Sequence, residues 1–98
     1  MKVAFIPWST GSVKPFFEVL NWPADLPQIG NTVTFALKSK DPTNNGQQVL
    51  ATGAVIDVME FREGYAEIWV DMGDFAQALQ DGITEIVKWS GISYAPSQ

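Results

Sequence analysis

Residues 48–72 read QVLATGAVIDVMEFREGYAEIWVDM, and this stretch predicts a long β-hairpin. Its first strand extends from Gln48 to Phe61 and its second from Tyr65 to Met72, and both are rich in β-branched and aromatic residues. Gly53 lies in the middle of the first strand, where a residue without a side chain favours a bulge or a sharp bend. Because a bend lets a small sheet roll up, this stretch predicts a curved, barrel-like sheet.

The distribution of apolar residues selects the register of the hairpin. A two-residue loop would place Asp57 among the apolar residues of the second strand. A three-residue loop over residues 62–64 avoids this and gives Gly64 the left-handed position of the turn. With this loop one face of the hairpin is apolar, with Ile56 opposite Val70 and Val58 opposite Ile68.

The opposite face of the hairpin mixes aromatic, acidic and apolar side chains, and it contains our candidate site residues. Such a face suits a contact between proteins, where Trp, Tyr and Met are enriched. It equally suits a pocket in which aromatic rings and a carboxylate hold an organic cation. In a third interpretation, a C-terminal helix or the connection around Trp22 covers this face. The predicted pairs are Asp57 with Trp69, Met59 with Glu67, and Phe61 with Tyr65.

The other segments predict further strands around this hairpin. Residues Lys2–Trp8 and Val13–Leu20 flank a cluster of turn-forming residues, and we expect them to pair as a hairpin. Residues Thr32–Lys38 alternate between apolar and polar side chains, as a half-buried antiparallel strand does. We therefore expect an α+β fold that is mainly β, with about five antiparallel strands in a small barrel or rolled sheet and a C-terminal amphipathic helix.

Two structures are possible after the hairpin. Asp74 occupies the position of a helix N-cap, and apolar residues recur at helical spacing from Phe75 to Val87. This spacing favours one amphipathic helix that ends near Gly91. The alternative is a short helix to about Asp81, followed by a strand from Ile83 to Trp89.

Length and composition indicate a single domain. The chain has 98 residues, of which 46% are hydrophobic, and this is enough for one core. We expect that core over residues 2–91 and a tail over residues 92–98. The apolar run Val3–Ile6 is interrupted by Pro7, far short of a membrane span or a signal-peptide core, so we predict a cytoplasmic protein without a membrane anchor.

Charge and residue types narrow the classes of function. The net charge is −5, and eight of the eleven acidic residues lie between Asp57 and Glu85. This acidity disfavours direct binding to nucleic acids, whose affinity depends on clustered Lys and Arg. It is compatible with a solvated surface, with a cationic ligand, or with a basic protein as partner.

Enzymatic activity has little support from the residue types. Histidine and cysteine are both absent, which removes the commonest general base, the thiolate nucleophile and the usual transition-metal ligands. Alternating strand residues bring carboxylates together by chance, and no spacing here marks a catalytic pair. We therefore predict a protein that is not an enzyme and holds no metal or cofactor. The carboxylates close together on the predicted hairpin are Asp57, Glu60, Glu67 and Asp71.

One motif resembles a known group of proteins. Residues 26–33 read Leu-Pro-Gln-Ile-Gly-Asn-Thr-Val and precede the long hairpin. This arrangement is similar to that of small bacterial β-barrel proteins of uncharacterised role, in which a Leu-Pro-x-x-Gly-Asp-x-Val turn and strand precedes a long hairpin. Some of them are carried on mobile gene cassettes. The similarity extends over residues 19–72, with Asn31 in place of the usual Asp. It implies a compact barrel-like sheet and brings no catalytic residues.

These observations favour a protein-interaction module that forms a homodimer through the mixed face of the hairpin. The first alternative is a binder of cationic or amphipathic small molecules in an aromatic pocket, where Asp57 or Glu67 orients the cationic group. A weaker alternative is an acidic decoy for a basic nucleic-acid-binding protein.

Overall fold

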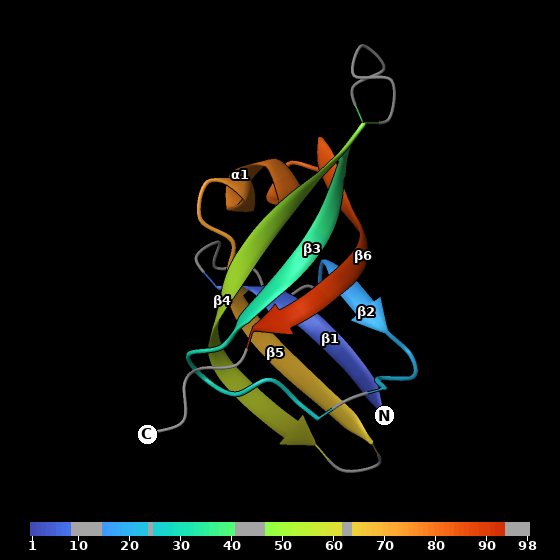
Figure 1. Ribbon diagram of the computed structural model, residues 1–98, viewed down its shortest axis with the longest axis vertical. Helices are drawn as coiled ribbons and strands as arrows, with labels where there is room; N and C mark the ends of the chain where they lie inside the picture. The colour runs from blue at the N-terminus through green and yellow to red at the C-terminus, as the bar shows by residue number, and fades with distance from the viewer. Residues whose placement is uncertain (9–14, 24, 41–46, 62–63, 94–98) are drawn as a thin grey trace.

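The protein folds into a nearly closed, barrel-like β-sheet, as the computed structural model shows (Figure 1). The structure describes residues 1–8, 15–23, 25–40, 47–61 and 64–93. Within these ranges the strand order is β2-β1-β5-β4-β3-β6, so the predicted barrel is confirmed, with six strands in place of about five. The elements are β1 (Lys2–Pro7), β2 (Phe17–Val19), β3 (Thr32–Ser39), β4 (Gln48–Phe61), β5 (Tyr65–Asp71), α1 (Phe75–Gln80) and β6 (Thr84–Ser93).

Strand β4 belongs to both halves of the barrel, as Figure 1 shows. Residues Gln48–Ala54 pair with β3, and residues from Ala54 to Phe61 pair with β5. Ala54 appears in both strand registers, with Thr32 opposite it on β3 and Asp71 opposite it on β5. The prediction of one long strand is therefore confirmed, and this strand passes from one half of the sheet to the other near its middle.

The two irregular positions of β4 lie close together but have different roles. A Cβ atom on Gly53 would lie 2.7 Å from Sδ of Met72 and 3.3 Å from Cβ of Val70, so a side chain there would require these two buried neighbours to shift. The bulge, which the sequence suggested at Gly53, lies instead at Ile56, which has no partner in the register with β5. Gly53 thus permits close packing, and Ile56 bends the strand three residues later.

The predicted register of the β4–β5 hairpin is confirmed from its loop to Asp57. Gly64 has a φ of 72°, the left-handed conformation expected for it. Beyond Asp57 the bulge shifts the pairing by one residue, so Val55, rather than Ile56, lies opposite Val70. The confirmed pairs are Phe61 with Tyr65, Met59 with Glu67, Val58 with Ile68, and Asp57 with Trp69.

The first strand has two neighbours, of which the sequence predicted one. Strands β1 and β2 form the expected antiparallel hairpin, in which Val3 lies opposite Val19. On its other edge β1 runs parallel to β5, with Lys2 opposite Tyr65 and Pro7 opposite Val70. The prediction of a purely antiparallel sheet is therefore wrong, because the chain between β1 and β5 provides the long crossover that a parallel pair needs.

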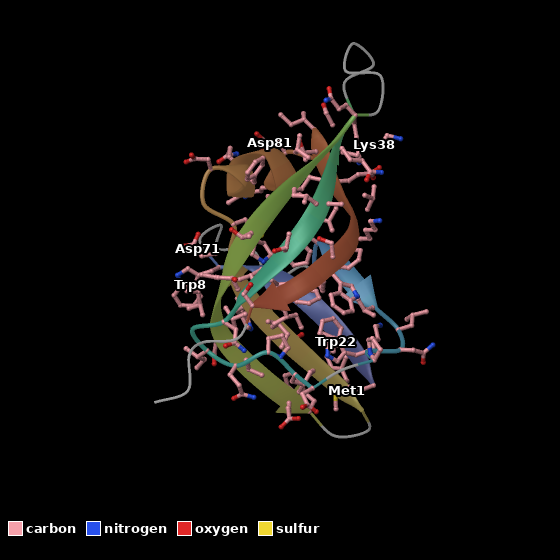
Figure 2. All side chains as sticks on the ribbon, in the orientation of Figure 1. Met1, Trp8, Trp22, Lys38, Asp71 and Asp81 are labelled. Atoms are coloured by element: carbon pink, nitrogen blue, oxygen red, sulfur yellow. The ribbon has the colours of Figure 1, made fainter. Side chains whose placement is uncertain are left out.

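The core is built around aromatic rings from both halves of the barrel. Phe5 of β1 and Phe35 of β3 are fully buried, and their ring centroids lie 5.1 Å apart in an edge-to-face arrangement. In the described residues no strand pairing joins β2 to β6. Near this seam Trp22, labelled in Figure 2, stacks on Trp89 of β6 with ring centroids 4.5 Å apart. Aromatic packing therefore connects the chain next to β2 with β6, the two outermost strands of the sheet.

The long C-terminal helix is wrong, and the alternative of a short helix and a strand is confirmed. Helix α1 ends at Gln80, and Gly82 adopts a φ of 74°, which L-residues with side chains rarely adopt. The N–H of Gly82 donates to the carbonyl of Leu79, and the N–H of Ile83 donates to that of Ala78. These two bonds form a Schellman motif, which terminates the helix.

The C-terminal strand also revises the predicted tail. Strand β6 continues to Ser93 and pairs with β3 along its length, so the tail begins later than residue 92. Asp74 does precede α1, but its side chain makes no capping hydrogen bond. The rest of the predicted tail, residues 94–98, lies outside the described residues. The described part of the chain contains no helix with the length and apolar character to span a membrane.

The close approach at Gly53 predicts the effect of a single methyl group. Gly53→Ala should lower the free energy of unfolding by ~1–3 kcal/mol, because the new Cβ overlaps Sδ of Met72. Gly91→Ala in β6 is the matched control: its Cβ meets no atom within 4 Å, so stability should stay equal or rise by ~0.4–1 kcal/mol. Urea unfolding of both variants measures the difference, and equal stabilities would contradict the proposed contact.

Candidate functional site

The six predicted site residues share the outer face of the β4–β5 hairpin. Of the residues that alternate with them, Val58, Ala66, Ile68 and Val70 belong to the core or pack against it, so period-two alternation directs the six to the other side of the sheet. Met59 and Phe61 are 42% and 46% exposed, and Asp57 is also exposed. The three residues on β5 are half-buried. We call this surface the aromatic-acidic face; it consists of Asp57, Met59, Phe61, Tyr65, Glu67 and Trp69.

Neither the helix nor the connection around Trp22, the two segments expected to cover this face, lies over Met59 and Phe61. These two residues form the open end of the face. Helix α1 packs against β6, and Figure 1 shows it far from the arrowhead at which β4 ends with Phe61. Trp22 packs inward on Phe5 and Trp89. In the described part of the chain, the part of the face around Met59 and Phe61 therefore remains open to solvent.

Two aromatic rings form a fixed plate at this open end. The rings of Phe61 and Tyr65 are stacked, with centroids 5.6 Å apart and an interplanar angle of 29°. The hydroxyl of Tyr65 donates a hydrogen bond of 2.9 Å to Oε2 of Glu67, two residues along the same strand face. Stacking holds one side of the tyrosine ring and the carboxylate holds its hydroxyl, so its orientation is well defined.

A cation from β1 completes this cluster. The parallel register places Lys2 beside Tyr65, and the Lys2 ammonium lies 5.8 Å from the centroid of the tyrosine ring. The same ammonium lies 2.7 Å from Oε2 of Glu18 on β2. The cluster thus extends across the four neighbouring strands β2, β1, β5 and β4, with a positive charge held between an aromatic ring and a carboxylate. Sequence reasoning missed Lys2 and Glu18, because only the unpredicted parallel pairing brings them to Tyr65.

The surroundings of Tyr65 oppose ionisation of its hydroxyl. Desolvation raises the pKa of Tyr65 above its ordinary value, and the hydrogen bond to Glu67 raises it further. The negative charges of Glu67 and Glu18 act in the same direction. The tyrosine therefore serves this face as a neutral hydrogen-bond donor.

The part of the face around Trp69 is more closed. The indole Nε1 of Trp69 is buried without a hydrogen-bond partner among the described residues, and the adjacent Ile6 of β1 is almost fully buried. Asp57 lies opposite Trp69, but its Oδ1 accepts a 2.9 Å hydrogen bond from the N–H of Val58. One oxygen of this carboxylate is therefore already engaged by its own strand.

The two main hollows of the described surface lie away from this face. A cleft of about 400 Å³ lies between α1, β6 and the end of β1. A more open groove of about 730 Å³ separates the second half of β4 from residues 25–29. The described residues contain no cluster of three or more potential metal ligands. The aromatic-acidic face is thus an open surface rather than the enclosed pocket that the small-molecule alternative assumed.

Comparisons of this chain with family models, curated proteins and solved structures give no match. The resemblance to small bacterial β-barrel proteins stays a prediction.

The hydrogen bond to Glu67 predicts how Tyr65 titrates. Glu67→Gln removes the negative charge beside the hydroxyl, so the pKa of Tyr65 should fall towards its ordinary value. Glu60→Gln, on the same hairpin, is the charge-matched control and should leave that pKa unchanged. NMR titration of the Tyr65 ring resonances measures both.

The same shift predicts the direction of the pH dependence of stability. The pKa of Tyr65 is higher in the folded state than in the unfolded state, so the protonated hydroxyl stabilises the folded protein. This stabilisation is complete below the pKa of the unfolded state. It is lost as the pH rises through the pKa of the folded state. Glu67→Gln should therefore reduce the loss of stability at alkaline pH. An equal alkaline loss in both proteins would contradict the assigned role of Glu67.

Proposed function

We propose that the protein is an interaction module that self-associates through its aromatic-acidic face. The observation that carries this proposal is the exposure of Met59 and Phe61, 42% and 46%, next to one another on one face of a paired strand. An apolar surface at this place costs solubility without stabilising the described monomer. Contact with a second molecule would remove it from water.

The chemistry and rigidity of the face support this proposal. Aromatic residues and Met are enriched in the centres of protein interfaces, where large side chains exclude water. Phe61 is already stacked on Tyr65, and Tyr65 is held by Glu67. Because these side chains are ordered before contact, association loses little further conformational entropy.

A second copy of the chain is a chemically suitable partner. In a twofold dimer the same patch meets itself, so the plate of Phe61 and Tyr65 on one protomer would pack on the equivalent plate of the other. Charges of both signs lie on and beside the face, because Glu67 belongs to it and Lys2 lies over the ring of Tyr65 and against Glu18.

Substitution of Phe61 tests this interface. Wild-type protein should show about twice its chain mass of 10.8 kDa in light scattering, and Phe61→Asp should show the single-chain mass. Leu50→Asp is the control, because it introduces the same carboxylate at an apolar residue that is 69% exposed on the other half of β4. This control should remain dimeric. A monomeric wild-type protein, or equal loss of dimer in both variants, would contradict the proposal.

One observation supports a second candidate, the binding of organic cations. The ammonium of Lys2 already lies over the ring of Tyr65 and against Glu18, so this surface has the chemistry that such binding needs. In this alternative an external amine would displace Lys2 or occupy an equivalent position over Phe61. The lack of an enclosing pocket at this face makes it the weaker candidate.

Salt distinguishes the two candidates. Raising the ionic strength from about 0.1 M to about 1 M shortens the screening length from about 10 Å to about 3 Å. Self-association should strengthen, because screening weakens the repulsion between two chains of net charge −5 while apolar burial persists. Binding of a cation should weaken under the same change. Sedimentation equilibrium and amine titrations across this range measure both.

A further inference from the structure

The second half of β4 has an edge that no described strand covers. On the side of β3 the strand ladder ends where Thr32 lies opposite Ala54. The turn before β3 then adds two backbone bonds, from the N–H of Gly30 to the carbonyl of Val55 and from the N–H of Val55 to the carbonyl of Asn31. From Asp57 to Phe61, β5 is the one strand that pairs with β4 within the described ranges.

The hydrogen bonds of β5 show which backbone groups point to this free edge. The N–H of Lys2 donates to the carbonyl of Gly64, and the N–H of Trp8 donates to that of Val70. The backbone groups of even-numbered residues, Gly64 and Val70, thus point from β5 towards β1. Because backbone groups alternate in direction along a strand, those of the odd-numbered residues of β5 point towards β4. Since odd-numbered residues of β4 lie opposite them, the backbone groups of Val58 and Glu60 are directed to the free edge.

The groove of about 730 Å³ runs beside these two residues. Its opposite wall is formed by the connection before β3, which contributes Leu26 and Ile29, the latter 64% exposed. With Val58 these side chains form the apolar part of a mixed lining, which also contains Gln28. Its charged lining residues in the described structure are both acidic, Asp25 and Glu60, so the groove is suited to an apolar segment that carries a positive charge.

We propose that an extended peptide with a basic residue between two apolar ones binds here as an additional strand on β4. Its backbone would pair with Val58 and Glu60, and its alternate side chains would enter the groove. The basic side chain would meet the carboxylates of Asp25 and Glu60, while its apolar neighbours contact Leu26 and Val58. This binding surface is separate from the aromatic-acidic face, which lies on the outer side of the same strand.

The free edge is partly protected in the unbound protein. The N–H of Val58 donates to Oδ1 of Asp57 at 2.9 Å, so a side chain of the same strand occupies one of the edge donors. Charged side chains at free edges limit unselective pairing between sheets. A peptide must displace this carboxylate to form a full ladder, and suitable side-chain contacts in the groove would offset that loss.

The test uses the peptide acetyl-Val-Thr-Lys-Thr-Val-amide, whose Val and Lys side chains point to one face of a strand. In an NMR titration of the labelled full-length chain, the amides of Val58 and Glu60 should show saturable shifts. The same peptide with N-methylated backbone amides should lose this binding, because it cannot donate to the edge. A peptide with Glu in place of Lys should bind at least about tenfold more weakly.

Variants at one position separate the backbone contribution from the charge. Glu60→Pro removes the edge N–H but leaves the bonds to β5 intact, so it should abolish peptide binding. Glu60→Gln keeps that N–H and should weaken binding by about tenfold through loss of charge. Glu85→Gln on β6 is the control and should leave binding unchanged. Phe61→Asp should not weaken peptide binding, so failure of the dimer proposal does not affect this test.

Three results would overturn the proposal. The first is an absence of saturable shifts at Val58 and Glu60 with the lysine peptide. The second is equal binding of the N-methylated or the glutamate peptide, which would show that neither the backbone edge nor the charge is recognised. The third is a doubled molar mass that Glu60→Pro abolishes and Phe61→Asp does not, which would assign this edge to a second copy of the chain.

Discussion

The fold depends on the passage of β4 from one half of the barrel to the other. This passage requires the bare Cα of Gly53, against which Met72 and Val70 pack, and the bulge at Ile56, which turns the strand. Once β4 has turned, β3 and β5 lie on its two sides and enclose one core, where Phe5 meets Phe35. The same turn ends the pairing with β3 at Ala54 and leaves the rest of that edge free. The feature that closes the barrel therefore also creates its open strand edge.

Features that depend on the period-two alternation of a strand were predictable from the sequence. Features that depend on pairing with a strand far away in the chain were not. The β4–β5 register was predictable from its loop to Asp57, because a slip of one residue would have exposed the whole apolar face. The segment from Ile83 to Val87 was misassigned, because its apolar residues fit a helical period and its partner β3 is some 50 residues away in the chain. A local signal did exist: Gly82 followed by β-branched residues is typical of a helix end followed by a strand.

The candidate site was likewise predictable only in its local part. Its six residues share one face because they alternate along two strands of a local hairpin, so the sequence sufficed to bring them together. Lys2 and Glu18 join them only through the parallel pairing of β1 with β5, which joins segments from opposite ends of the chain. Parallel pairing leaves little local trace, since no turn specifies it. The free edge was also beyond local prediction, because it depends on where β3 stops relative to β4.

The two surfaces proposed here meet at Asp57. This residue belongs to the aromatic-acidic face, opposite Trp69, yet its carboxylate accepts the N–H of Val58 at the free edge. A strand that takes this N–H would release the carboxylate, whose negative charge would then face a partner without its backbone hydrogen bond. In a dimer whose faces already carry Glu67, such a charge opposes close contact between the two copies. Occupation of the edge and self-association through the face should therefore disfavour each other, and the coupling passes through a single side chain and not through a change of fold.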